Sequence, residues 1–176
     1  QFPGYGQSTF RMSTQMDSNA SEWDKKYCEK GWFARSMPDL NQANPLVLNY
    51  LTQNAIWWIE YADLDGLRVD TYSYNDKEGI AKWTKAIMDE YLHFNIMGEV
   101  WLNQSAQVSY WQKDSPISAI QSYNTYLPTV MDFPLFNAIG EAFRAAPSWD
   151  QGMIQLYDNL TNDFLYKDIN NLLIFA

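Results

Sequence analysis

Apolar positions recur along the chain at two different periods, and the two periods alternate. From residue 45 to residue 62 they recur every three or four residues, directly after the cap pair Asn44–Pro45, and this predicts an amphipathic helix. The same period predicts further helices over 78–92, 105–111, 136–143 and 149–160. Short, almost continuously apolar runs predict strands at 67–70, 94–101, 129–133 and 172–175. Residues 1–43 have no sustained period, which predicts an irregular segment with at most short helices.

The alternation of apolar strands with amphipathic helices indicates an α/β fold with a parallel sheet covered by helices. Four strands are too few for an eight-stranded barrel, which needs about 250 residues. Two folds therefore remain, an open α/β sheet and part of a (β/α)8 TIM barrel. Because the last apolar run continues to Ala176, where a loop would be expected, we favour the partial barrel.

The charge balance narrows the class of ligand. The 176 residues hold 21 acidic and 12 basic side chains, so the net charge of −9 disfavours nucleic acid and anionic lipid as partners. Eight Trp and 12 Tyr supply flat rings with polar edges, which suit sugars. No apolar run approaches the roughly 20 residues of a membrane span. The single Cys28 permits no internal disulfide and leaves a periplasmic and a cytoplasmic location in a bacterium equally open.

The candidate chemistry lies at the ends of the first two predicted strands. Residues two apart in a strand share a face, so Arg68 and Asp70 project together. The guanidinium of Arg68 would favour the charged form of Asp70, which suits a nucleophile. By the same parity Glu99 shares a face with Met97 and Trp101 in the next strand.

The spacing of the two carboxylates indicates a mechanism. Glu99 follows Asp70 by 29 residues, which is one βα repeat, so both would lie at the carboxyl ends of adjacent parallel strands. Neighbouring strands are about 4.8 Å apart, and a retaining glycosidase needs carboxyl groups about 5–5.5 Å apart. We therefore predict that Asp70 attacks the sugar while Glu99 acts as acid and base. Tyr72 and Trp101, just past the strand ends, are predicted to stack on sugar rings.

Three motifs carry a family resemblance. Gly66-Leu67-Arg68-Val69-Asp70 resembles the G-x-R-x-D signature of the α-amylase family, glycoside hydrolase family 13. Gly98-Glu99-Val100-Trp101 resembles its third signature, and Met37-Pro38-Asp39-Leu40-Asn41 its short fifth motif. The resemblance is strongest to the neopullulanase and cyclomaltodextrinase branch. It implies that residues 1–43 end a B-domain excursion and that 44–176 form a partial catalytic barrel, about strands four to seven with their helices.

The resemblance also implies roles. Asp70 matches the nucleophile, Glu99 the proton donor and Arg68 the arginine that contacts the nucleophile. The implied activity is retaining hydrolysis of α-1,4 bonds, with α-1,6 bonds left open, in cyclodextrins, pullulan or malto-oligosaccharides during starch degradation. The implied partner is an α-glucan oligosaccharide, and a homo-oligomer of the full-length parent stays open. No cofactor is required, but structural calcium is an open question because Asp39 lies where some relatives bind it, and metal ligands remain unknown.

The sequence departs from the family at two motifs. The first signature, with its histidine, and the fourth, with the third carboxylate, are absent, so we expect the chain alone to have an incomplete active site and little activity. The only histidine, His93, matches no motif and is predicted to lie at the polar end of a helix or in a loop. Two alternatives remain, a transglycosylase of the same family and a non-catalytic carbohydrate-binding homologue. A nucleotide-binding sheet is disfavoured because no strand precedes a Gly-rich phosphate loop.

Overall fold

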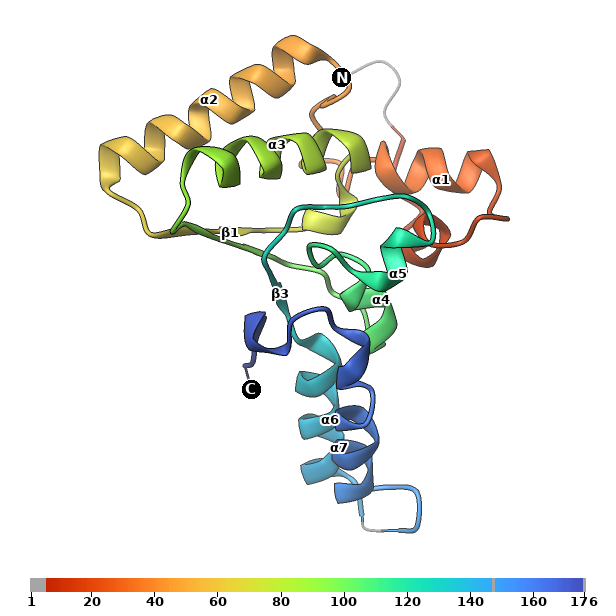
Figure 1. Cartoon of the computed structure of the whole chain (residues 1–176). Helices are drawn as coiled ribbons and strands as arrows, with labels where there is room; N and C mark the ends of the chain where they lie inside the picture. The colour runs from red at the N-terminus through yellow and green to blue at the C-terminus, as the bar shows by residue number, and fades with distance from the viewer. Residues whose placement is uncertain (1–5, 147, 176) are drawn as a thin grey trace.

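A four-stranded parallel sheet forms the centre of the computed structural model, which describes residues 6–146 and 148–175 (Figure 1). The strands lie side by side in chain order, and Arg68 pairs with Met97 and Val69 with Gly98. Their bounds are β1 Gly66–Val69, β2 Asn95–Gly98, β3 Thr129–Met131 and β4 Leu172–Leu173. The predicted parallel α/β sheet is confirmed. β1 has the predicted length but begins and ends one residue earlier than predicted. The other three strands are shorter than predicted, because the last residues of each apolar run extend past the paired region.

Helices precede β1 and follow β1, β2 and β3, and the ends of several of them are set by capping residues that can be read in the sequence. The helix α2 (Pro45–Ala62) has the predicted bounds: the Asn44 side chain accepts a hydrogen bond from Leu46 N, and Asp63 ends the helix in the left-handed region. The helix α3 (Lys77–Glu90) is capped by Asp76, whose carboxylate accepts from Gly79 N. Shorter helices α4 (Ser105–Ser109) and α5 (Pro116–Ala119) connect β2 to β3.

The helices α6 (Phe133–Arg144) and α7 (Met153–Leu160) lie side by side and project away from the sheet (Figure 1). The first begins three residues earlier than predicted, because the Asp132 side chain caps it by accepting a hydrogen bond from Leu135 N. The second begins four residues later than predicted, after a left-handed Gly152.

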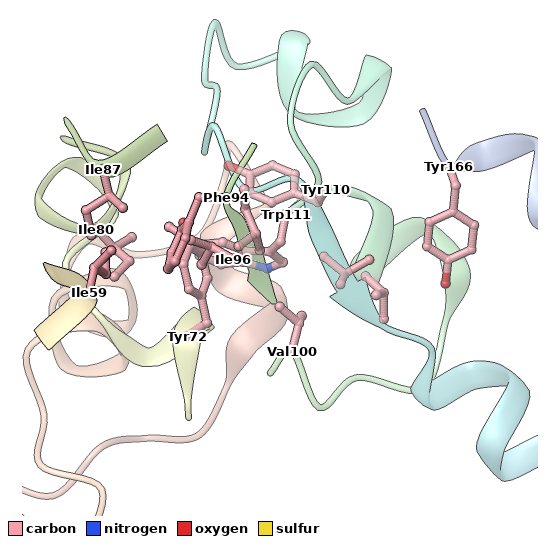
Figure 2. Packing of buried hydrophobic residues seen from close by; sticks show 13 residues of the cluster. Ile59, Tyr72, Ile80, Ile87, Phe94, Ile96, Val100, Tyr110, Trp111 and Tyr166 are labelled. Carbon is pink, nitrogen blue, oxygen red and sulfur yellow. The ribbon is translucent and has the colours of Figure 1, made fainter. Parts of the chain in front are cut away.

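The main core lies between the sheet and α2, α3 and α4 (Figure 2). Ile59 of α2 and Ile80 and Ile87 of α3 cover one side. Tyr72 packs edge-on against Trp111, with ring centroids 6.0 Å apart. Burial of such large apolar side chains contributes roughly 1.5–3 kcal/mol each to stability.

Residues 6–43 are irregular except for short elements, as predicted, the longest being α1 (Glu22–Glu29), which Ser21 caps. This segment is attached to the rest of the chain by Gln15, whose Nε2 donates to Ser73 O at 2.9 Å. Cys28 is fully buried beside Met12, and burial raises the pKa of its thiol to about 11. The proposed boundary after residue 43 stays a prediction, and residues 1–5, 147 and 176 of the two expected segments lie outside the described residues.

The outer edge of β1 lies beside an apolar groove of about 660 Å³. Its walls come from α2, β1 and α3 and include Leu48, Leu51, Trp58, Leu67 and Trp83. Within the described part of the chain, no strand pairs with this edge of β1. Over the same residues, every helix is too short or too polar to cross a membrane.

Candidate active site

The parallel register places Asp70 and Glu99 next to each other. Each is the first residue after its strand, and the preceding residues Val69 and Gly98 are register partners. The backbone ladder extends one step further, because Glu99 N donates to Val69 O at 2.9 Å and Tyr72 N donates to Glu99 O at 3.0 Å. Both carboxylates therefore lie at the carboxyl edge of the sheet, as predicted.

Arg68 joins the two carboxylates. One terminal nitrogen donates to Asp70 Oδ1 and the other to Glu99 Oε1, each at 2.9 Å. The sequence predicted only the first of these contacts. Two like charges on adjacent strand ends repel each other, and one guanidinium shared between them offsets that repulsion while fixing their separation. The Asp70 side chain is 61% exposed, whereas that of Glu99 is 12% exposed.

The second oxygen of Glu99 is held by the backbone. Thr71 N donates to Glu99 Oε2 at 2.9 Å, and Thr71 adopts a left-handed conformation with φ 46° that aims its N–H at the carboxylate. A β-branched residue in this region is strained, which is common where backbone strain supports a functional geometry. Each Glu99 oxygen thus accepts one hydrogen bond and keeps a second lone pair for a further contact.

A pocket of about 270 Å³ opens at these carboxylates. It is lined by Phe33, Met37, Asp70, Thr71, Tyr74, Glu99 and Trp101. The Trp101 ring stacks nearly parallel on Phe133, at 5.0 Å between centroids, and is 62% exposed. One flat face of Trp101 is thus supported by the protein while much of the ring faces solvent, which is consistent with the predicted sugar platform.

The sequence reasoning missed four residues of the pocket lining, which are Phe33, Met37, Thr71 and Tyr74. Phe33 and Tyr74 meet edge to face at 5.4 Å, and Phe10 packs edge-on against both, so the irregular N-terminal segment builds one wall of the pocket. Phe33 carries no signal in the sequence, because its placement depends on long-range packing. Met37 belongs to the fifth motif, and Tyr74 follows β1 closely, so these two could have been inferred.

The prediction that Tyr72 stacks on sugar rings is wrong. Its side chain is fully buried, and its hydroxyl is paired with Thr84 Oγ1 at 2.8 Å. The left-handed Thr71 turns the chain into the short helix η2 (Tyr72–Tyr74), which directs Tyr72 into the core and leaves Tyr74 at the pocket. Burial raises the pKa of the Tyr72 phenol above its ordinary range.

The remaining sequence candidates lie away from this pocket. His93 is exposed in the turn between α3 and β2, as predicted. Asp39 is half-buried, and burial together with the charge of Asp76 raises the pKa of its carboxyl to about 6. Over residues 6–146 and 148–175, no three or more His, Cys, Asp or Glu side chains cluster in a way that could hold a metal. The question of structural calcium therefore stays open.

Curated relatives share the sequence of this region. A β/α-amylase of Paenibacillus polymyxa is 27% identical over 132 residues, which cover 75% of this chain and 9% of that protein. An intracellular maltogenic amylase of Bacillus subtilis is 33% identical over 101 residues, or 57% of this chain and 16% of the relative. A cyclomaltodextrinase of Geobacillus thermopakistaniensis is 30% identical over 52% of this chain and 15% of its own length. The chain thus spans less than a fifth of each of these relatives. No family profile matches it.

Solved structures share the fold. An α-amylase of Anoxybacillus is 26% identical and covers 84% of this chain with a TM-score of 0.65, while 29% of that amylase is matched. An α-amylase of Geobacillus thermoleovorans, solved in complex with acarbose, is 30% identical over 84% of this chain and 30% of its own, with a TM-score of 0.63. The motifs, the parallel sheet and these matches together show that the chain is similar in sequence to the α-amylase family, including its cyclomaltodextrinase-like members, and that it has the fold of part of a (β/α)8 barrel.

Proposed function

We propose that this chain supplies the nucleophile and the acid/base of a retaining α-glucan hydrolase. The observation that carries the proposal is the bridge from Arg68 to both Asp70 and Glu99 at the carboxyl ends of adjacent parallel strands. Barrel enzymes place their chemistry at this edge, and two close carboxylates are the groups that retaining glycoside hydrolysis requires.

The geometry accommodates both chemical steps. Arg68 holds Asp70 Oδ1 and orients the carboxylate for attack on the anomeric carbon. As the new C–O bond forms, the glycosidic C–O bond breaks and Glu99 gives its proton to the leaving oxygen. In the second step Glu99 takes a proton from water, the water oxygen bonds to the anomeric carbon, and Asp70 leaves as a carboxylate. Two inversions at the same carbon restore the original α configuration.

The pocket and the relatives support an α-glucan as substrate. Trp101, Phe33 and Tyr74 present aromatic surface around the carboxylates, and the described lining contains no Lys. This surface suits the apolar face of a neutral sugar ring better than a charged ligand. The names of the curated relatives include maltogenic amylase and cyclomaltodextrinase, so we propose that the substrates are malto-oligosaccharides, cyclodextrins or pullulan, cleaved at α-1,4 bonds.

A trapping experiment tests the proposal in the polypeptide that carries this chain. A slow fluorinated α-glucosyl fluoride should leave a sugar covalently bound to the peptide that contains Asp70, detected by mass spectrometry. Asp70→Asn should abolish both the adduct and the turnover of maltoheptaose. Asp65→Asn, which changes an exposed aspartate directly before β1, is the matched control and should retain both the adduct and the turnover. Full turnover by Asp70→Asn would exclude Asp70 as the nucleophile.

Transglycosylation is the second candidate, and one relative favours it. A cyclomaltodextrin glucanotransferase of Klebsiella oxytoca is 33% identical over 73 residues, which cover 42% of this chain and 11% of that enzyme. The same three residues would form the covalent intermediate, and only the acceptor would differ. The ratio of glucose release to longer products from maltotriose distinguishes the two reactions.

A further inference from the structure

The tryptophan at the rim of the pocket lies in a tight turn after β2. Leu102 N donates to Val100 O at 2.9 Å, so the backbone turns sharply at Trp101. Val100 is fully buried, whereas Trp101 is 62% exposed and lines the pocket beside Glu99. Because an exposed ring on a short turn has several rotamers open to it, the orientation of Trp101 depends on what packs against the ring.

Phe133 supplies that contact. It is the first residue of α6, which begins just after β3 (Figure 1), and it is only 3% exposed. Its ring lies almost parallel to that of Trp101, with 5.0 Å between centroids and an interplanar angle of 15°. Phe133 therefore covers one face of Trp101, and a ligand in the pocket can stack only on the opposite face. A single free face held in one orientation is preorganised for stacking.

The Phe133 ring is itself held in place. The Asp132 carboxylate caps α6 by accepting from Leu135 N at 3.0 Å, and Asp132 N donates to Leu173 O of β4 at 2.9 Å. These bonds fix the start of the helix, and with it the backbone of Phe133, against the sheet. Phe175, just past β4, meets the Phe133 ring edge to face, at 5.1 Å and 80°. Phe133 thus links the loop after β2 to the end of β4.

A second contact joins the same loop to α6. Asn137 Nδ2 donates to Asn103 Oδ1 at 2.9 Å. Asn137 follows Phe133 by four residues and therefore lies on the same face of the helix. The loop that carries Trp101 is thus attached to α6 at two successive turns, once by stacked rings and once by a hydrogen bond. The face of α6 that begins with Phe133 is the support of this loop.

These contacts indicate a role for Phe133 beyond filling the core. A leucine would still bury apolar surface at this position, but it has no flat face for Trp101 to stack on. We propose that Phe133 is a positioning residue of the pocket, which holds the Trp101 ring beside Glu99 so that a sugar ring of the substrate stacks on its free face. Phe133 acts through Trp101 and touches no substrate itself. That the substrate is an α-glucan rests on the proposed function.

Steady-state kinetics of Phe133→Leu, in the polypeptide that carries the chain, test this role. KM for maltoheptaose should rise about tenfold, because the stacking surface is no longer held in place. The change in kcat should stay below about twofold, because Arg68, Asp70 and Glu99 keep their contacts. Phe133→Tyr, which keeps the ring, should restore most of the affinity. An unchanged KM in Phe133→Leu overturns the proposal.

Phe136→Leu is the matched control. It makes the same change on the same helix and removes a ring that stacks on Phe175, at 4.8 Å and 16°, instead of on Trp101. KM for maltoheptaose should stay at the parent value in this variant, although the free energy of unfolding falls in both leucine variants. An equal rise of KM in Phe136→Leu and Phe133→Leu would show a general loss of packing and overturn the proposal.

A double-mutant cycle tests whether Phe133 acts through Trp101. Trp101→Ala alone should also raise KM about tenfold. Adding Phe133→Leu to it should produce little further change, because the ring that Phe133 supports is already gone. A combined rise of about 100-fold would mean that the two residues act independently, and it would overturn the proposal.

Further measurements keep this test separate from that of the proposed function. In the Asp70→Asn background, calorimetric titration with maltoheptaose gives Kd without turnover, and adding Phe133→Leu should weaken binding about tenfold. Unchanged binding together with lost turnover in Asp70→Asn would refute the positioning role alone. A raised KM in Phe133→Leu together with full turnover by Asp70→Asn would refute the nucleophile alone. If Phe133→Leu does not fold, Phe133→Met supplies the comparison, because Met fills irregular space without a flat ring.

Discussion

Arg68 carries most of the electrostatic organisation of the site, because a single guanidinium donates to a carboxylate on each of two strands. Arginine suits this role because its terminal nitrogens form a planar fork that reaches two acceptors at a fixed separation. A lysine at the same position would place all its donors on a single nitrogen and would not fix the separation of the two carboxylates. The Arg68 side chain is 45% exposed, so we expect its ion pairs to position the two carboxylates rather than to add much to the free energy of unfolding.

We therefore predict that Arg68→Lys lowers kcat/KM on maltoheptaose about 100-fold, or roughly 3 kcal/mol of transition-state stabilisation, while the unfolding temperature changes little. Steady-state kinetics and thermal unfolding of the polypeptide carrying the chain measure the two effects. Arg144→Lys, at the exposed end of α6, is the control and should leave both unchanged. Normal kinetics in Arg68→Lys would show that the bridge is dispensable.

Asp39 allows a prediction about pH. Burial, and next the charge of Asp76, raise its pKa from 3.8 to about 6. Between these values the folded state binds more protons than the unfolded state, so the contribution of Asp39 to stability is fully present below pH 4 and is lost as pH rises through 6. Asp39→Asn should stabilise the protein by about 1 kcal/mol at pH 8, after allowance for partial exposure, and have no such effect at pH 4. Urea unfolding at pH 4 and pH 8 measures the change in the free energy of unfolding, and Asp89→Asn, at an exposed position, is the control. An equal change at the two pH values in Asp39→Asn would contradict the prediction.

At the scale of elements, the end of β2 depends on a glycine. A Cβ on Gly98 would lie 2.6 Å from Leu127 Cδ2 and 2.9 Å from Tyr72 Cγ, so both buried side chains would have to move. Gly98 directly precedes Glu99 and pairs with Val69, which precedes Asp70. The close packing that excludes a methyl group is therefore the same packing that sets the position of the acid/base.

Gly98→Ala is expected to cost about 1–3 kcal/mol of stability through overpacking and to reduce kcat by displacing Glu99. Gly140→Ala is the control, and we expect it to raise the free energy of unfolding instead of lowering it. A Cβ at that position in α6 meets only the flexible end of Arg144 at 3.5 Å or more, and alanine in a helix interior gains roughly 0.5–1 kcal/mol. Chemical denaturation of both variants measures the difference, and a neutral Gly98→Ala would refute the tight packing.

At the scale of the whole molecule, Lys77 joins the N-terminal segment to the sheet region. Its ammonium group donates to Gln15 O at 3.2 Å, to Gln121 Oε1 at 3.3 Å and to the Tyr110 hydroxyl. It also lies over the Tyr123 ring at 4.4 Å. Burial lowers the pKa of Lys77, and these contacts compensate part of that burial cost. Because Phe33 and Met37 belong to the same segment, this attachment also supports one wall of the pocket.

Removal of this ammonium group should loosen the attachment. Lys77→Ala is predicted to lower stability by about 2 kcal/mol, because Gln15 O and Gln121 Oε1 lose a charged donor. Hydrogen exchange should also accelerate in residues 6–43 more than in α2. Lys82→Ala, exposed on the same helix, is the matched control. If Lys77→Ala changes hydrogen exchange equally in residues 6–43 and in α2, residues 6–43 are held by other contacts.

What the sequence determined by itself is local. The caps and periodic apolar positions set the bounds of α2, and strand parity with the βα spacing placed Arg68, Asp70 and Glu99 at one edge of a parallel sheet. These features depend on nearest neighbours and on the regular geometry of strands and helices. The low activity expected of the chain alone remains a prediction.

The tertiary structure decided the rest. It turned Tyr72 into the core through the left-handed Thr71 and gave Tyr74 its place at the pocket, which strand parity could not anticipate because the strand had already ended. It brought Phe33 from the irregular segment to the carboxylates, and it added Glu99 to the partners of Arg68. Each of these outcomes depends on contacts between residues far apart in the chain, whose energies are settled only when the whole core packs.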